Sequence, residues 1–236
     1  MDVSSALLAG LMMFAAGAQL GTQPLLPQAQ SLSFRELDRA EATARYGHPN
    51  EMWRYRALRA LKLQQPTRAA DYFRQAGRYG DKFSQHALSL MYWHGVGVAR
   101  DVAQAYVWGD LAAERGYRDL LLVREKMWMS METRQRRHAL SIGPRMYAEY
   151  GDAAAKPRME WELRKALANA TGSRVGAQKD RVRFLNLGAI ADLDVSGFYE
   201  RERWNATAYW REQDRQWDAK VIVLPLEQLP DPPPSP

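Results

Sequence analysis

The chain has 236 residues, a formal net charge of +6 and no cysteine. A chain of this length can form one or two domains, and its hydrophobic fraction of 46% is typical of a globular protein. The absence of cysteine excludes disulfide bonds, thiolate metal sites, a catalytic thiol and a lipoprotein anchor. The positive charge favours acidic partners, such as anionic lipid head groups, wall polymers or nucleic acid, but it does not choose among them.

The N-terminal segment has the layout of a secretory signal peptide. Its apolar part, ALLAGLMMFAAGA over residues 6–18, carries no charge and is shorter than the roughly 20 residues of a membrane span. It ends in the A-x-A pattern that signal peptidase accepts, so we expect a signal peptide over residues 1–18 and a polar linker over residues 19–32. The protein is then periplasmic or secreted. Asp2 and the lack of Lys or Arg before the apolar part leave two other interpretations open, an uncleaved membrane anchor or an N-terminal core helix.

Signals that start and stop helices follow one another from residue 33 onwards. The S-x-x-E sequence that begins at Ser33 is a capping box, in which the serine hydroxyl and the glutamate carboxylate accept backbone N–H groups. Asn50, Thr67 and Asp101 are expected to cap later helices, and Ser84 to open another. The predicted helices end at Gly47, before Pro66, at Gly80, at Gly95 and at Gly116.

Three more helices are expected after these. Residues 118–128 have the helical spacing of apolar side chains, and Ser130 starts the next helix. Pro144 should break or kink that helix, because proline lacks the N–H group that an inner helical position donates. Pro157 suits the first position of a last helix, which reaches Gly172.

The composition changes after Gly172. RVRFLNL at residues 181–187 and AKVIVLPL at residues 219–226 have the residue content of strands, so residues 173–226 are expected to form a small α+β or β-like segment. Residues 227–236 are rich in proline and are expected to form a disordered, extended tail.

Two helical segments repeat one another at a period in the mid-thirties. Ala70 matches Ala105 and Phe73 matches Trp108 at a spacing of 35 residues, and a glycine follows each segment. A period of this length with small residues at fixed places is typical of helical repeats, because small residues let helix backbones approach closely.

Residues 87–116, ALSLMYWHGVGVARDVAQAYVWGDLAAERG, resemble the Sel-one-like repeat family, whose members are relatives of the tetratricopeptide repeats. The family pattern is A-L-x-x-M-Y-x-x-G-x-G-V-x-x-D-x-x-x-A-x-x-W-x-x-x-A-A-x-x-G. The chain matches it at Ala87, Leu88, Met91, Tyr92, Gly95, Gly97, Val98, Asp101, Ala105, Trp108, Ala112, Ala113 and Gly116. A weaker copy with a shorter turn covers residues 52–80, and a half-copy without the turn follows Tyr117.

The resemblance implies a fold that is mostly α-helical. Residues 33–172 would form an α/α solenoid of helix pairs like those of the Sel-one-like and tetratricopeptide repeats, followed by the small C-terminal β-containing segment. The resemblance also implies that the protein scaffolds protein complexes, often at the bacterial cell envelope.

The stretch from Gly95 to Asp101 is interpreted as the corner between two helices. A phosphate-binding loop would need a Lys and a Ser or Thr at fixed spacing after its glycines, and none follows Gly97. In a repeat, Gly95 ends the first helix in a left-handed conformation and Gly97 lets the chain reverse. Val98 then fills the core between the helices, and Asp101 caps the second helix.

The sequence offers no pattern typical of catalysis or of a metal site. His86 and His94 could share a helix face, but no third ligand is evident beside them or beside His48 and His138. No G-x-S-x-G or S-x-x-K motif occurs, and the acid pairs are interpreted as solvated ion-pair partners: Asp192 with Asp194, and Glu200 with Glu202. We therefore expect no enzyme, no cofactor and no bound metal. No nucleic-acid partner is expected either, because no groove-reading motif or stacking platform is present.

The expected function is that of an adaptor that binds partner proteins on the concave face of a short solenoid. The residues expected to bind the partner are Arg54, Arg56, Arg59, Trp93 and His94. Trp93 and Tyr106 lie off the core positions of the family, so they are either exposed in this surface or packed beneath the C-terminal segment. An alternative function is the binding of an anionic wall or membrane polymer through the basic surface. Other membrane contact is expected only through an uncleaved leader.

Overall fold

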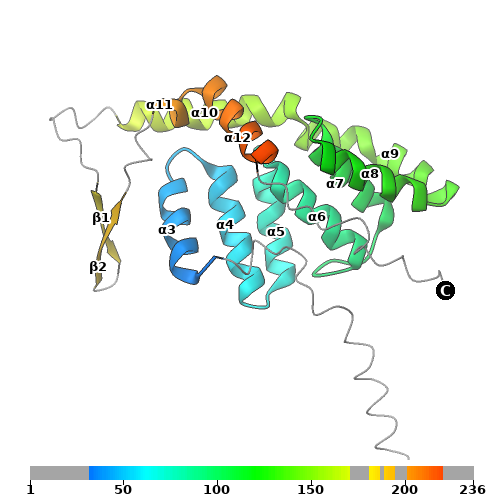
Figure 1. The fold of residues 1–236 in the computed structure, drawn as a ribbon, viewed down its shortest axis with the longest axis horizontal. Coiled ribbons are helices and arrows are strands. Elements are labelled where there is room, and N and C mark those ends of the chain that lie inside the picture. The colour runs from blue at the N-terminus through cyan, green and yellow to red at the C-terminus, as the bar shows by residue number, and fades with distance from the viewer. Residues whose placement is uncertain (1–31, 171–180, 187–188, 195–200, 220–236) are drawn as a thin grey trace, which may run out of the picture.

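The computed structural model describes residues 32–170, 181–186, 189–194 and 201–219, and the side chains of residues 32–168 and 203–215. Most of these residues are helical, which confirms the expectation of a mainly α-helical fold (Figure 1). The predicted signal peptide, most of the linker and the proline-rich tail lie outside the described residues. The helices are α3 (Phe34–Ala44), α4 (Pro49–Lys62), α5 (Pro66–Gly77), α6 (Lys82–His94), α7 (Val102–Ala113), α8 (Arg118–Ser130), α9 (Thr133–Tyr150), α10 (Asp152–Ala170), α11 (Arg201–Trp204) and α12 (Ala206–Ala219).

The helices from α3 to α8 follow one another side by side, joined by short turns (Figure 1). The most extensive packing is between α4 and α5 and between α6 and α7, while α3 packs on α4, α5 on α6 and α7 on α8. The helices therefore form antiparallel hairpins in which each element contacts its neighbours along the chain.

The core of this array is built from small and large apolar side chains in alternation. Ala57, Ala69, Ala70, Ala87 and Ala105 have no exposed surface, so the helix backbones approach closely at these points. Larger side chains fill the remaining space, and each contributes about 1.5–3 kcal/mol of burial free energy. The apolar and aromatic residues of the repeat motif are buried, as expected of core positions: Ala87, Leu88, Met91, Tyr92, Ala105, Trp108, Ala112 and Ala113.

Several local signals are confirmed by the structure. The Ser33 hydroxyl accepts the Glu36 N–H at 3.2 Å, and the Glu36 carboxylate accepts the Ser33 N–H at 2.7 Å. Gly95 ends α6 in a left-handed conformation with φ of 70°. Asp101 caps α7 by accepting two backbone N–H groups at 3.0 Å, and Val98 packs against the core.

Gly97 has a second constraint beyond the reversal of the chain. Its φ is +73°, and a Cβ at this position would lie 2.7 Å from the Thr67 nitrogen and closer still to the Pro66 carbonyl group. The turn between α6 and α7 thus packs directly on the backbone at the start of α5. This contact joins one helical hairpin to the preceding one.

The predicted starts of α4 and α5 were wrong. Proline occupies the first position of each helix, at Pro49 and Pro66. An N–H group at this position would have no acceptor within the helix, so its absence in proline costs nothing. Asn50 and Thr67 are therefore helical residues and not caps. The Asn50 side chain is buried instead and donates to the Tyr209 hydroxyl at 2.7 Å.

The predicted starts of α6 and α9 also differ from the structure. Asp81 caps α6, and its carboxylate accepts the Ser84 N–H at 2.8 Å, so Ser84 lies within the first turn. Ser130 is the last residue of α8, and α9 begins after Glu132, which forms a capping box with Gln135. A carboxylate can take the capping role of a serine because it accepts the same N–H groups.

Two prolines lie inside helices, one where a break or kink was predicted and the other where a helix start was predicted. Pro144 does not break α9, which runs through it to Tyr150. α10 begins at Asp152 and contains Pro157 in its interior. The Asp152 N–H donates to the Glu114 carboxylate at 2.9 Å, so a side chain from another helix fixes this helix start.

In three helices the predicted terminal glycine lies in the turn that follows. α3, α5 and α7 end three residues before Gly47, Gly80 and Gly116, whose φ values are 81°, 74° and 79°. The left-handed glycine is thus used by the turn that reverses the chain.

The helices α10, α11 and α12 lie across one end of the array, where the turns that precede α4 and α6 are found (Figure 1). A Cβ at Gly47 would lie 2.7 Å from the Trp204 ring, and a Cβ at Gly80 would lie 3.2 Å from the Trp210 ring. These glycines therefore let the C-terminal helices approach the turns.

The backbone between α10 and α11 contains two strands, β1 (Arg181–Asn186) and β2 (Ala189–Asp194), which pair antiparallel. The second predicted strand begins at Ala219, which is the last residue of α12, and the rest of it lies outside the described residues. A small β-containing domain over residues 173–226 stays a prediction.

Candidate functional site

The structure separates the residues that were expected to form one partner-binding surface. Arg56 and Arg59 line a common pocket, together with residues of α3 and α5. Arg54, on the same helix, forms an ion pair with Asp81 at 3.0 Å, and its side chain is 16% exposed. One of the three predicted arginines is therefore structural, and the other two line a cavity.

The expectation that Trp93 is exposed was wrong. Only 5% of its surface is accessible, because α6 is enclosed on all sides and every residue from Ser84 to Trp93 is buried. Among the described residues, Trp93 belongs to the core between the hairpins, and its packing beneath the C-terminal segment stays a prediction. Tyr106 is partly buried against Trp128, with ring centroids 4.9 Å apart. His94 is half-buried at the end of α6, where burial and the charge of Arg100 lower its pKa.

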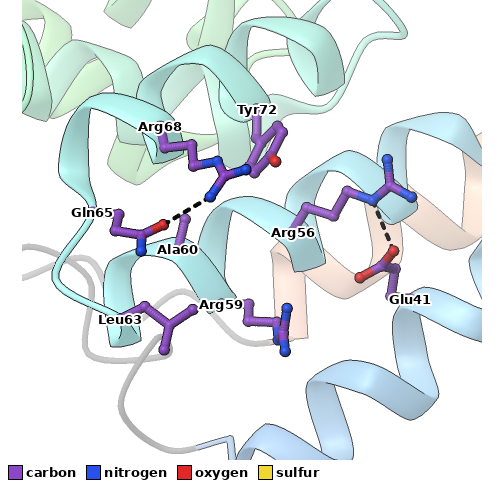
Figure 2. A pocket seen from close by; sticks show the side chains of 8 residues that line it. All are labelled: Glu41, Arg56, Arg59, Ala60, Leu63, Gln65, Arg68 and Tyr72. Atoms are coloured by element: carbon purple, nitrogen blue, oxygen red, sulfur yellow. Dashed lines mark hydrogen bonds and ion pairs between the residues drawn. The ribbon is translucent and has the colours of Figure 1, made fainter.

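The cavity that Arg56 and Arg59 line is called the arginine pocket here (Figure 2). It has a volume of about 170 Å³ and lies between α3, α4 and α5. This volume is below the roughly 300–1,000 Å³ of small-molecule and cofactor sites, but it can take individual side chains of a partner. Its lining residues are Glu41, Arg56, Arg59, Ala60, Leu63, Gln65, Arg68 and Tyr72.

Two of the three arginines in the pocket are paired with carboxylates of α3. Arg56 donates from Nε to Glu41 at 2.7 Å (Figure 2). Arg59 lies 3.1 Å from Asp38, and this pair is largely solvated, with side-chain exposures of 48% and 57%. Glu41 also contacts Arg45 at 3.5 Å. The α3 carboxylates therefore neutralise part of the positive charge of the pocket.

Arg68, from the first turn of α5, is the third arginine of the pocket. Its Nη1 donates to the Gln65 side-chain oxygen at 3.3 Å, which is a long and neutral contact (Figure 2). Within the part of the chain that the structure describes, Arg68 has no carboxylate partner. It is therefore the most available cation of the pocket, which Tyr72 from the same helix also lines (Figure 2).

Aromatic side chains hold one wall of the pocket in place. The Tyr72 ring stacks on Trp53 with centroids 5.6 Å apart and planes inclined by 28°. The Arg56 guanidinium lies over the same Trp53 ring, 4.7 Å from its centroid. A cation over an indole face is attracted by about 0.5–1 kcal/mol at an exposed site, so Arg56 is oriented before any ligand arrives.

Sequence reasoning missed Glu41, Arg68 and Tyr72 as members of this site. Glu41 lies on α3, and Arg68 and Tyr72 lie on α5, so only the packing of these two helices on either side of α4 brings them together. One signal was available for Arg68, which is a basic residue in the first turn of a helix, where the dipole disfavours positive charge.

A second group of charged residues is buried where the C-terminal helices meet the array. Arg203 donates to Glu51 at 2.8 Å, and the Tyr209 hydroxyl donates to Glu51 at 3.1 Å. Burial alone would raise the pKa of Glu51, but the nearby charges of Arg203, His48 and Arg54 lower it to about 2. The carboxylate is therefore ionised and fully occupied by internal partners. It attaches α11 and α12 to the array.

The histidines do not form a metal site in the described part of the chain. His48 is fully buried and lies 3.0 Å from the carbonyl oxygens of Tyr46 and Arg203. Burial lowers the pKa of His86 to about 4, so its ring is neutral at physiological pH. His138 lies on the exposed side of α9. Among the described residues, no group of three or more metal-ligating side chains is close enough to hold an ion.

Comparisons with models of known protein families, with curated proteins and with solved structures find no match for the chain. In the described segments, no helix has both the length and the hydropathy that a membrane span needs.

Proposed function

We propose that the protein is a non-enzymatic adaptor that binds an acidic segment of a partner protein in the arginine pocket. The observation that carries this proposal is a cavity with three arginines and one glutamate in its lining, one of the arginines having no carboxylate partner among the described residues. Arginine forms bidentate hydrogen bonds with carboxylates, so the pocket suits aspartate and glutamate side chains.

The composition of the lining supports a protein partner over a polymer that is bound by charge alone. Leu63 is 45% exposed at the rim, and Ala60 and Tyr72 contribute apolar surface. Interfaces between proteins combine aromatic and arginine side chains with apolar contacts in this way. A polyanion would need a longer basic surface than one pocket provides.

The array of helical hairpins supports the proposal at the level of the fold. We propose that α4 with α5, and α6 with α7, are Sel-one-like repeats of a short solenoid, and that the segment over residues 173–226 closes one end of it. Repeat arrays present extended surfaces to partner proteins. The leader further suggests that the partner is a periplasmic or secreted protein of the bacterial envelope.

Site-specific photo-crosslinking in the cells that produce the protein tests the proposal. A photoreactive amino acid replaces Leu63 at the rim of the pocket, and in a matched strain it replaces Met129, which is 72% exposed on α8. We expect a discrete protein adduct from position 63 and not from position 129. The adduct should disappear when Arg56, Arg59 and Arg68 are all changed to Gln.

Two kinds of result would contradict the proposal. One is the same adduct from both positions, or an adduct that survives the triple substitution. The other is the absence of any protein adduct together with binding to envelope fragments that is lost between about 50 mM and about 300 mM salt, as for a charge-driven contact. That second result would favour the alternative function, the binding of an anionic wall or membrane polymer.

A further inference from the structure

We propose that Asp38 and Glu41 are internal substitutes for the carboxylates of a partner. They hold Arg59 and Arg56 until an acidic segment of the partner displaces them. This inference rests on the function proposed for the arginine pocket and specifies its ligand. The ligand is a helical segment with two carboxylates three positions apart. The two α3 carboxylates thereby weaken the binding of any segment that cannot replace both.

Two ion pairs must open for the ligand to bind. One of them is weak, and in the other the released carboxylate stays near a second arginine. The side chains of Arg59 and Asp38 are both about half exposed, and an ion pair this solvated contributes little to stability. The pair of Arg56 and Glu41 is more shielded, with exposures of 29% and 15%. When Arg56 turns to a ligand, Glu41 keeps the nearby charge of Arg45, while Asp38, once released from Arg59, is solvated by water.

Both paired arginines keep hydrogen-bond donors for a ligand. Arg56 uses its Nε for Glu41, and the atom of Arg59 nearest to Asp38 is also Nε. Neither arginine forms a hydrogen bond from its Nη groups to a described residue. A guanidinium has five N–H donors, and a bidentate contact uses two of them. An incoming carboxylate can therefore bind before the internal one has left.

The spacing of the internal acids defines the spacing that the pocket accepts. Asp38 and Glu41 lie three positions apart on α3, and Arg56 and Arg59 lie three positions apart on α4. Residues at this spacing share one face of a helix. A partner helix with acids three positions apart reproduces the arrangement of Asp38 and Glu41. Arg68 offers this helix a first contact, because no internal carboxylate has to be displaced from it.

Fluorescence anisotropy with the full chain and a defined probe tests this inference. The probe is a labelled, alanine-based helical peptide of about 16 residues with two glutamates three positions apart. A second probe has the same two glutamates seven positions apart. We expect the first probe to bind more tightly, and Glu41→Gln and Asp38→Asn to raise its affinity by up to about fivefold each, the equivalent of about 1 kcal/mol. Arg68→Gln should lower its affinity.

Glu149→Gln is the matched control. It also removes one negative charge from an ion pair, that with Arg78, whose side chains are about as exposed as those of the Asp38 pair. It lies on α9, away from the pocket, so it should change the affinity only slightly. Asp38→Asn keeps the test decisive if Glu41→Gln lowers stability, because Asp38 is well exposed and contributes little to the fold.

The outcomes separate this inference from the proposed function. If the probe binds in a way that depends on Arg68, but Glu41→Gln and Asp38→Asn behave like Glu149→Gln, the internal-substitute role is wrong and the proposed function stands. Equal affinity for the two probes would overturn the spacing rule. If neither probe binds the natural protein or any variant, both proposals fail. This includes Glu41→Gln, which frees Arg56, and Asp38→Asn, which frees Arg59.

Discussion

Gly97 combines two constraints that are usually separate, a left-handed backbone and a close backbone contact. We predict that Gly97→Ala lowers the free energy of unfolding by about 2–4 kcal/mol, because the new methyl group meets the Pro66 backbone and the φ of +73° strains an L-residue. Gly116→Ala is the matched control, since its φ is +79° but nothing lies within 4 Å of the new Cβ. Gly116→Ala should lower the free energy of unfolding by about 1 kcal/mol. Urea unfolding of both variants measures the difference, and equal losses would show that the contact with Pro66 is unimportant.

Glu51 is expected to link stability to acid pH. Its pKa is lowered from an ordinary value of 4.5 to about 2 in the folded protein. Its contribution to stability is therefore complete above about pH 4.5 and is lost as the pH falls towards 2. A shift of this size corresponds to a contribution on the order of 3 kcal/mol.

The variant Glu51→Gln isolates this contribution from that of other carboxylates. We predict that the variant is less stable than the natural protein at neutral pH, because Arg203 and Arg54 lose a buried counter-charge. The difference should narrow between pH 4.5 and the lowest pH at which the fold persists. Chemical unfolding at a series of pH values measures both curves, and two parallel curves would contradict the pKa assignment.

At the scale of the helix, the sequence predicted best the boundaries that are set by neighbouring residues. Ser33, Gly95 and Asp101 act through groups a few residues away, so their roles were readable from spacing alone. Asn50 was misjudged because its partner, Tyr209, is 159 residues distant in the sequence. Trp93 was misjudged because a helix enclosed on all sides has no solvent face, and its polar residues do not mark exposure.

The same distinction explains what could be predicted of the arginine pocket. Arg56 and Arg59 were predicted as partner-binding residues, together with Arg54 on the same helix and with Trp93 and His94. The acids that pair with them lie on α3, and Arg68 lies on α5. No local sequence pattern reveals how these helices pack on α4. The period of 35 residues predicted that hairpins exist, but not which of their faces would meet.

The prolines inside helices lead to a prediction for α9. Pro144 is exposed in this helix and cannot donate to the carbonyl group four residues earlier. We predict that Pro144→Ala raises the free energy of unfolding by about 1–2 kcal/mol, the gain of a helical hydrogen bond less the loss of rigidity in the unfolded chain. Pro49→Ala, at the first position of α4, is the control and should bring no gain. Thermal unfolding compares them, and an unchanged midpoint for Pro144→Ala would mean that the proline fits a bend that the packing of α9 requires.

The whole molecule differs from a simple row of hairpins because its C-terminal helices connect turns that are far apart in the sequence. Arg203 on α11 reaches Glu51 on α4, while Asp214 on α12 accepts hydrogen bonds from Tyr117 and from Arg115, the latter at 3.4 Å. In a row of repeats each unit contacts only its neighbours, so the ends can unfold separately. Here the C-terminal helices attach both to the start of α4, after the first turn, and to the fifth turn, between α7 and α8.

We therefore predict that the full chain unfolds in a single transition, and that a chain ending at residue 200 does not. Without α11 and α12, the buried polar groups of Asn50 and Glu51 lose their partners, which costs about 1–3 kcal/mol for each unsatisfied group. Hydrogen exchange should then show α3 and α4 opening at lower free energy than α6 and α7. Arg211→Ala, on the exposed side of α12, is the control and should keep the single transition. If the shortened chain keeps one transition at the same midpoint, the hairpins hold together by their own packing, and the C-terminal helices have no part in the cooperativity of the fold.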